Sequence, residues 1–98
     1  MINYKEETLK KGESWIYSWN VQPQLSRSNT TISSGTPPVW SICSGSSVSI
    51  SNDSNSTTIV QAQLTGLSAG TTYVQVAVTY TNGEIGIYQI KATVEALC

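Results

Sequence analysis

Few residues in this chain are of the types that carry out chemistry. Histidine is absent, which excludes Ser-His-Asp and Cys-His nucleophile systems and imidazole-bound zinc. Beyond the N-terminal third, the only carboxylates are Asp53, Glu84 and Glu95, and no spacing places two of them side by side as a general acid and base. We therefore expect no enzymatic activity and no cofactor.

The cysteines and the one acidic loop do not predict a metal site either. Cys43 and Cys98 lack CxxC spacing, although one disulfide between them remains arithmetically possible. No cationic neighbour would activate Cys43, so we expect a buried, inert thiol there. Residues 52–56 resemble the start of a calcium loop but lack its glycine and its closing glutamate, so residues 51–57 are predicted to be a polar turn.

Three tryptophans and five tyrosines could form a stacking platform for sugars or bases. Nucleic-acid binding would also need a cationic track, and the chain has only five lysines and arginines and a net charge of −1. In a domain this small without phenylalanine, rings at alternating strand positions are expected to form the core instead. The predicted core consists of Trp15, Tyr17, Trp19, Trp40, Leu64, Tyr73, Val76, Val78 and Ile90.

The elements that must position these rings are strands, because apolar and polar residues alternate through most of the chain after residue 12. The predicted strands cover residues 13–20, 39–43, 48–50, 59–64, 71–81 and 85–94. Residues 22–38 hold all three prolines and many turn formers. They are therefore predicted to be an irregular connection with at most one short edge strand over residues 30–32.

The last two predicted strands are joined by Asn82-Gly83, the pair favoured in a two-residue type I′ turn. Apolar residues of the returning strand change parity, with Ile85 and Ile87 on one side and Tyr88 and later ones on the other. This change predicts a β-bulge near residues 86–88.

Six or seven short strands without intervening helices predict an antiparallel β-sandwich of Greek-key type. Trp40 on a mid-chain strand narrows this to an immunoglobulin-like fold, as do residues 67–73 (LSAGTTY), which resemble the tyrosine corner of fibronectin type III and related domains. Tyr73 is out of phase with the valines that follow it. Either a bulge follows the corner, or Tyr73 faces a different surface of the sheet.

The charges divide the chain into two expected parts. Charged residues are dense before residue 14, whereas between Arg27 and Glu84 the only ionisable acid or base is Asp53. Residues 1–12 are predicted to be an N-terminal arm, either extended or with one helical turn over residues 8–11, and residues 13–98 a single sandwich domain. The chain shows no signal-peptide pattern and no membrane-spanning run, so we expect it to fold in a reducing cytoplasm.

Several motifs together resemble the small immunoglobulin-like virion proteins of tailed bacteriophages, which are described as fibre-tail adaptors or head-decoration proteins. The similarity covers residues 11–94. The motifs that carry it are residues 11–13 before an aromatic strand, residues 31–34, Trp40, residues 64–73 (LTGLSAGTTY) and residues 79–84 (TYTNGE).

This resemblance implies a virion structural protein on the tail or capsid surface, made in the host cytoplasm and present in several copies of a symmetric assembly. Its partners would be other virion proteins, with no role for nucleic acid or membrane. An adaptor between tail and fibres is the first hypothesis; a capsid decoration protein and a carbohydrate- or receptor-binding module are the alternatives. The candidate interface residues are Tyr4, Leu9, Arg27, Asn29, Ile32, Pro37 and Pro38.

Overall fold

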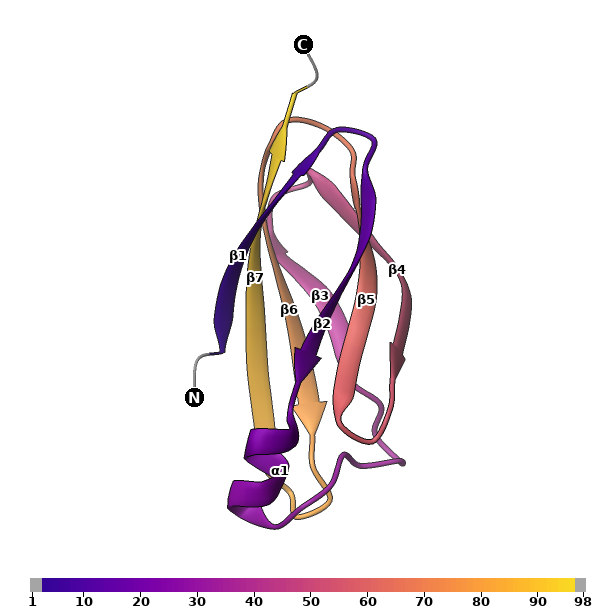
Figure 1. Cartoon of the computed structure of the whole chain (residues 1–98), viewed down its shortest axis with the longest axis vertical. Coiled ribbons are helices and arrows are strands. Elements are labelled where there is room, and N and C mark those ends of the chain that lie inside the picture. The colour runs from indigo at the N-terminus through magenta and orange to yellow at the C-terminus, as the bar shows by residue number, and fades with distance from the viewer. Residues whose placement is uncertain (1–2, 97–98) are drawn as a thin grey trace.

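The computed structural model describes residues 3–96, which form two β-sheets packed face to face and one short helix (Figure 1). The four-stranded sheet has the order β1 (Tyr4–Lys10), β7 (Ile85–Glu95), β6 (Gly70–Thr79), β3 (Val39–Ser44). The three-stranded sheet has the order β2 (Ser14–Asn20), β5 (Ile59–Gly66), β4 (Val48–Asn55). The helix α1 (Gln22–Ser28) closes the lower end of the sandwich in Figure 1. The predicted β-sandwich is therefore confirmed.

The core lies between the two sheets and follows the period-2 alternation of the strands. Along β5, β6 and β7 every second side chain is buried, as expected when one face of each sheet is covered. Leu64, Val76, Val78 and Ile90 are fully buried. Trp19 is 9% exposed, and its ring lies 5.3 Å from that of Tyr88. Aromatic and branched side chains thus hold the two layers together.

Two of the rings predicted for the core lie at the surface. Trp15 is 53% exposed, although it shares the inward-facing parity of Tyr17 and Trp19 on β2. Tyr73 is 36% exposed because it stands on the outer face of β6, opposite to Thr72 and Val74. Tyr73 thus faces the other surface of its sheet, which decides between the two alternatives for the corner. Tyr17 and Trp40 are half-buried and pack against the rim of the core.

The N-terminal segment is a strand of the sandwich, and the expectation of a separate arm over residues 1–12 was wrong for the described part. β1 pairs in parallel with β7, from Tyr4 opposite Gln89 to Lys10 opposite Glu95, so the sandwich is not wholly antiparallel. Leu9 is only 1% exposed and belongs to the core. No helical turn forms over residues 8–11, because so short a helix gains less than pairing along a whole strand.

Helix α1 lies in the segment predicted to be irregular. Pro23 stands in its first turn, where the missing backbone N–H costs nothing. Asn29 ends the helix in the left-handed conformation with φ of 50°, and its backbone N–H bonds to the carbonyl of Leu25. Leu25 and Gln24 are buried against the sandwich. The proline and asparagine that suggested a loop are thus the start and stop signals of a helix. No helix within residues 3–96 is long and apolar enough to cross a membrane.

The turn predicted over residues 51–57 is largely strand. β4 extends to Asn55, with an irregularity in its pairing to β5 between Ser51 and Ser54. Asn52 lies in this irregular stretch with φ of 49°, a conformation that asparagine tolerates better than most residues. The reversal of direction occurs only after Asn55, where the backbone N–H of Ser56 bonds to the carbonyl of Ile59.

The β6–β7 hairpin forms where Asn82-Gly83 predicted it, but with a different turn. Gly83 has φ of 93°, whereas Asn82 keeps a negative φ, which a type I′ turn does not allow. The Gly83 N–H donates to the Tyr80 carbonyl at 3.0 Å, and the Tyr80 N–H donates to the Glu84 carbonyl at 2.9 Å. This pattern is that of a three-residue hairpin loop with glycine at its left-handed position.

The bulge predicted near residues 86–88 is absent. Pairing between β6 and β7 is continuous, from Thr79 opposite Ile85 to Gly70 opposite Val94. Ile85 and Ile87 are simply on the outer face of the four-stranded sheet, where they are 64% and 42% exposed. The change of parity in the sequence therefore marks apolar surface and not a change in strand pairing.

Candidate functional site

The four edge strands differ in how their unpaired backbone groups are protected. β1 carries four charged side chains, which discourage another strand from pairing with it: Lys5, Glu6, Glu7 and Lys10. Lys5 also donates from Nζ to the backbone carbonyl of Ser18 at 2.7 Å. A charged side chain therefore occupies a backbone carbonyl of the edge strand β2 as well. β3, the opposite edge of the four-stranded sheet, has the sequence VWSICS and no charge. β3 is therefore the edge of this sheet most open to a further strand.

An apolar patch adjoins β3 on the outer face of the four-stranded sheet. Val39 lies opposite Ala77 of β6, which in turn lies opposite Ile87 of β7. With Ile85 these residues form what we call the Val39–Ile87 patch. Val39 is 59% exposed and Ile85 64%, which is unusual for branched side chains on a strand. Neighbouring exposed apolar side chains of this kind make the patch a candidate contact surface.

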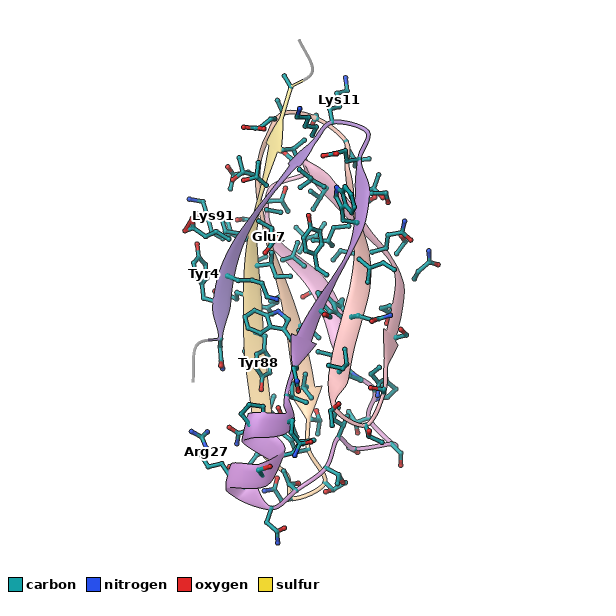
Figure 2. The ribbon with its side chains drawn as sticks, in the orientation of Figure 1. Tyr4, Glu7, Lys11, Arg27, Tyr88 and Lys91 are labelled. Atoms are coloured by element: carbon teal, nitrogen blue, oxygen red, sulfur yellow. The ribbon has the colours of Figure 1, made fainter. Side chains whose placement is uncertain are left out.

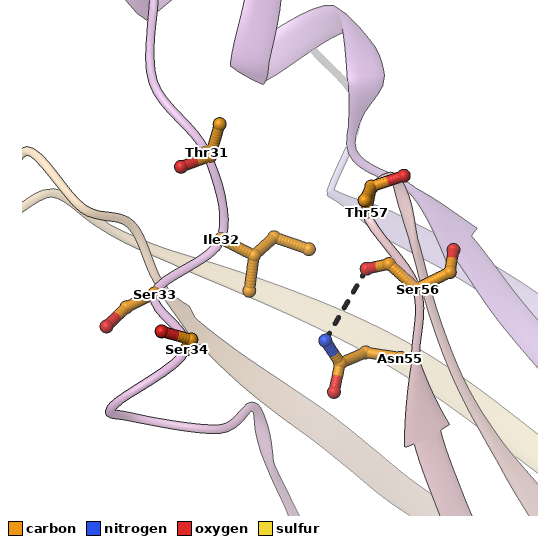
Figure 3. A pocket seen from close by; sticks show the side chains of 7 residues that line it. All are labelled: Thr31, Ile32, Ser33, Ser34, Asn55, Ser56 and Thr57. Carbon is orange, nitrogen blue, oxygen red and sulfur yellow. Dashed lines mark hydrogen bonds between the residues drawn. The ribbon is translucent and has the colours of Figure 1, made fainter.

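A hollow of about 380 Å³ lies between the segment after α1 and the β4–β5 turn (Figure 3). Its lining consists of Thr31, Ile32, Ser33, Ser34, Asn55, Ser56 and Thr57. Ile32 packs against the core beneath it and forms an isolated bridge to Tyr80. The lining offers hydroxyls and amides but no ionisable group. Such a site can hold a neutral polar group by hydrogen bonds, but it lacks an acid–base residue for catalysis.

A second hollow, of about 530 Å³, lies between the edge strands β1 and β2. We call it the Trp15 hollow; its lining is Glu7, Thr8, Glu13, Trp15, Ile16 and Tyr17. Glu7 stands on the side of β1 that faces β2, whereas Tyr4 and Lys91 point to the opposite side (Figure 2). Burial raises the pKa of Tyr17, and the carboxylates of Glu7 and Glu13 raise it further. Sequence parity placed Trp15 in the core and did not predict this site.

The residues proposed as an interface from the sequence do not form one surface. Leu9 and Pro38 are buried, so neither is free to contact a partner, and Ile32 is half-buried. Four are exposed: Tyr4 on the outer face of β1, Arg27 and Asn29 at the end of α1, and Pro37 before β3. None of the seven residues belongs to β3 or to the Val39–Ile87 patch.

Cys43 is exposed, contrary to the expectation of a buried thiol. Its Sγ donates to Oε1 of Gln75 on the neighbouring strand at 3.0 Å. It lies where the pairing of β3 with β6 becomes irregular, between Ile42 and Ser44, which turns the side chain outward. Cys98 lies outside the described residues. Within residues 3–96, no group of three or more acidic or cysteine side chains could hold a metal ion.

A buried pair of tyrosines ties the lower end of the sandwich together. The hydroxyls of Tyr80 and Tyr88 lie 2.7 Å apart, and both residues are 2% exposed. Gly86 leaves room for the Tyr88 ring, since a Cβ there would come within 3.0 Å of it. Burial and the bond to Tyr88 raise the pKa of Tyr80 far above its ordinary value.

We expect the protein to lose stability above about pH 10, because Tyr80 ionises there in the unfolded chain but not in the folded one. The unfolded state then binds fewer protons, so its free energy falls relative to the folded state as the pH rises. Urea denaturation between pH 9 and 11 will show the loss, and Tyr80→Phe will flatten it. Tyr73→Phe, at an exposed ring, should leave the slope as it is; an equal slope in the Tyr80 variant would contradict the assignment.

Solved structures of other proteins share this architecture. The chain is similar to the PKD domain from KIAA 1837 protein, with a TM-score of 0.56 and 22% identity over 94% of this chain and 79% of that one. It is also similar to part of an endo-fucoidan hydrolase of glycoside hydrolase family 107, with a TM-score of 0.56 and 13% identity over 98% of this chain and 13% of the hydrolase. No family model and no curated protein matches the sequence. The likeness concerns the fold, and it confirms the immunoglobulin-like β-sandwich.

Proposed function

We propose that this chain is a non-catalytic structural module of a tailed-bacteriophage particle that joins the tail to its fibres by protein contact. The observation that carries the proposal is the uncharged edge strand β3 beside the Val39–Ile87 patch. The assignment to a tailed-bacteriophage particle comes from the sequence resemblance over residues 11–94. The immunoglobulin-like fold is compatible with such a role, and folds of this kind serve many functions.

The contact would be strand addition. An extended segment of a neighbouring virion protein pairs with the free backbone groups of β3, and its side chains cover Val39 on the outer face. The charged edge β1 does not compete for this segment. The four-stranded sheet thus has one edge that can accept a further strand and one edge whose charges discourage pairing. A neighbour that pairs with this sheet would therefore bind at β3 only.

Quantitative mass spectrometry of purified particles tests the proposed place in the virion. An adaptor will be present at the tail in a small fixed number of copies. Hundreds of copies over the shell would instead make the chain a capsid decoration protein, the alternative within the same class. Absence from purified particles would overturn both.

Val39→Lys is expected to lower incorporation into particles about tenfold or more, because it places a charge beside the edge where a strand must pair. The matched control is Leu67→Lys, at a leucine that is 49% exposed in the β5–β6 loop and belongs to neither β3 nor the Val39–Ile87 patch. Circular dichroism of both variants will check that they fold. Wild-type amounts of the Val39 variant in particles would remove β3 from the proposal.

One observation favours a second candidate, a carbohydrate- or receptor-binding module. Sugar binding needs an aromatic ring open to solvent, and Trp15 is 53% exposed beside the half-buried Tyr17. The two carboxylates in the same hollow give it a negative charge, which a neutral sugar does not require. Titration with a cationic compound and with a neutral oligosaccharide separates the two kinds of ligand.

A further inference from the structure

The inner faces of β1 and β2 oppose one another along the open side of the sandwich. Lys5 and Glu7 alternate on this face of β1, and Trp15, Tyr17 and Trp19 on this face of β2. At the lower end Lys5 closes the space between the strands: its Nζ lies 4.3 Å above the Trp19 ring and bonds to the β2 backbone. A cation held over an indole is a favourable pair, more so when partly shielded from water.

The upper end of the same space, the Trp15 hollow, has the aromatic rings without the cation. Glu7 is half-buried, yet its carboxylate makes no hydrogen bond or ion pair with any residue of the described chain, 3–96. Glu13 uses Oε1 to accept the backbone N–H of Lys10 at 2.6 Å. Lys11 lies at the tip of the β1–β2 turn, away from the hollow (Figure 2). A bound cation would therefore meet the Glu7 carboxylate without displacing an existing ion pair.

The chemistry of the lining selects the ligand. Its charged groups are two carboxylates, which accept hydrogen bonds and attract positive charge, and its exposed indole presents a π-face. Burial raises the pKa of Tyr17 most, and the further rise caused by Glu7 and Glu13 agrees with a negative potential at this place. A guanidinium or ammonium group would stack on Trp15 and bond to Glu7, repeating at the upper end what Lys5 does at the lower end.

We propose that the Trp15 hollow binds an arginine or lysine side chain of a second neighbouring virion protein. The inference rests on the proposed function, since it names the chemistry by which that neighbour is recognised. It adds a second contact on the β1–β2 side of the sandwich, while β3 holds the opposite edge of the four-stranded sheet. The module would thus hold two neighbours at once, one by strand pairing and one through a cationic side chain bound in the hollow.

The test is an NMR titration of the full chain with Nα-acetyl-arginine amide. We expect saturable shifts of the Trp15 indole N–H and of the backbone amides of Glu7, Glu13 and Tyr17, weakened by added salt. Nα-acetyl-citrulline amide has nearly the same shape without the charge, and it should give no saturable shifts. Equal binding of the two compounds would overturn the proposal, as would the absence of binding by the arginine compound.

Two variants of β1 give a matched comparison. Glu7→Gln is expected to weaken binding about fivefold, because it removes the unpaired carboxylate from the hollow. Glu6→Gln makes the same change of charge on the outer face of the same strand and should leave the affinity within about twofold. Equal effects would show that only net charge matters and would contradict a site.

A third variant and a second set of ligands complete the test. Trp15→Ala should abolish saturable binding while the shifts of core residues such as Ile90 stay in place. Saturation by a neutral oligosaccharide in place of the arginine compound would overturn the proposal in favour of the carbohydrate-binding module. The failure of this inference remains distinguishable from that of the proposed function: particles that take up Glu7→Gln normally but reject Val39→Lys would refute only the cation site.

Discussion

Leu9→Ala will lower the free energy of unfolding by about 2–5 kcal/mol, the usual cost of truncating a leucine in a packed core. Leu9 is 1% exposed and is the side chain by which β1 enters the core. It lies opposite Val94 in the parallel pairing of β1 with β7. Its loss therefore leaves a cavity and also loosens the strand that covers the β7 edge. Urea denaturation followed by tryptophan fluorescence measures the change.

Thr8→Ala is the matched control for Leu9→Ala. Thr8 is the preceding residue on the same strand, and its side chain is exposed. Its replacement should change stability by about 0.5 kcal/mol or less. If both variants had the same small effect, β1 would contribute nothing to the core, and the interpretation of the first twelve residues as a separate arm would be restored.

Gly45→Ala is expected to cost about 3 kcal/mol or more, because two effects act together. Gly45 has φ of 92°, which a residue with a Cβ adopts only with strain. A Cβ at this position would also lie 2.5 Å from the carbonyl oxygen of Thr71 and 2.9 Å from Cα of Thr72. The backbone cannot move away easily, since the Ser47 N–H bonds to the buried Thr72 hydroxyl at 2.8 Å. Overpacking adds to the strain.

Two other glycines separate these two effects. Gly35→Ala should be nearly neutral, because nothing lies within 4 Å of its added Cβ and its φ is not positive. Gly83→Ala should cost about 1–2 kcal/mol, because its φ is 93° but the space around it is open. Thermal and urea unfolding of the three variants will rank them. A Gly45 variant as stable as the Gly35 variant would contradict the tight crossing of the β3–β4 turn over β6.

The elements that the sequence predicted well are those whose signal is local. Alternation alone placed the strands later found as β2, β5, β6 and β7, and the position of the β6–β7 hairpin followed from one dipeptide. Helix α1 was not predicted, because its local sequence is ambiguous. Pro23 and Asn29 are compatible with either a loop or the two ends of a helix, and a helix of seven residues is too short to show a helical period.

The candidate sites depended on neighbours that are distant in the sequence. β1 was taken for an arm because its charges look unlike a core strand, and only its pairing with β7, some 85 positions away, makes it part of the sheet. Trp15 has the parity of a core residue, yet it lines an open hollow between the edge strands β1 and β2, so its ring stays exposed. Parity gives the face of a strand on which a side chain stands, but not what covers that face.

The class of this protein follows from its amino-acid sequence, since a poorly charged, histidine-free chain of alternating strands builds an immunoglobulin-like sandwich. These properties follow from the composition and from the alternation of apolar and polar residues along the strands. Both can be read from the sequence without knowing which strands are neighbours. The tertiary structure alone decided which edge is bare and which is charged, and which tryptophan closes the core and which lines a hollow. Edges and hollows arise from the order of strands within the sheets, and long-range pairing sets that order.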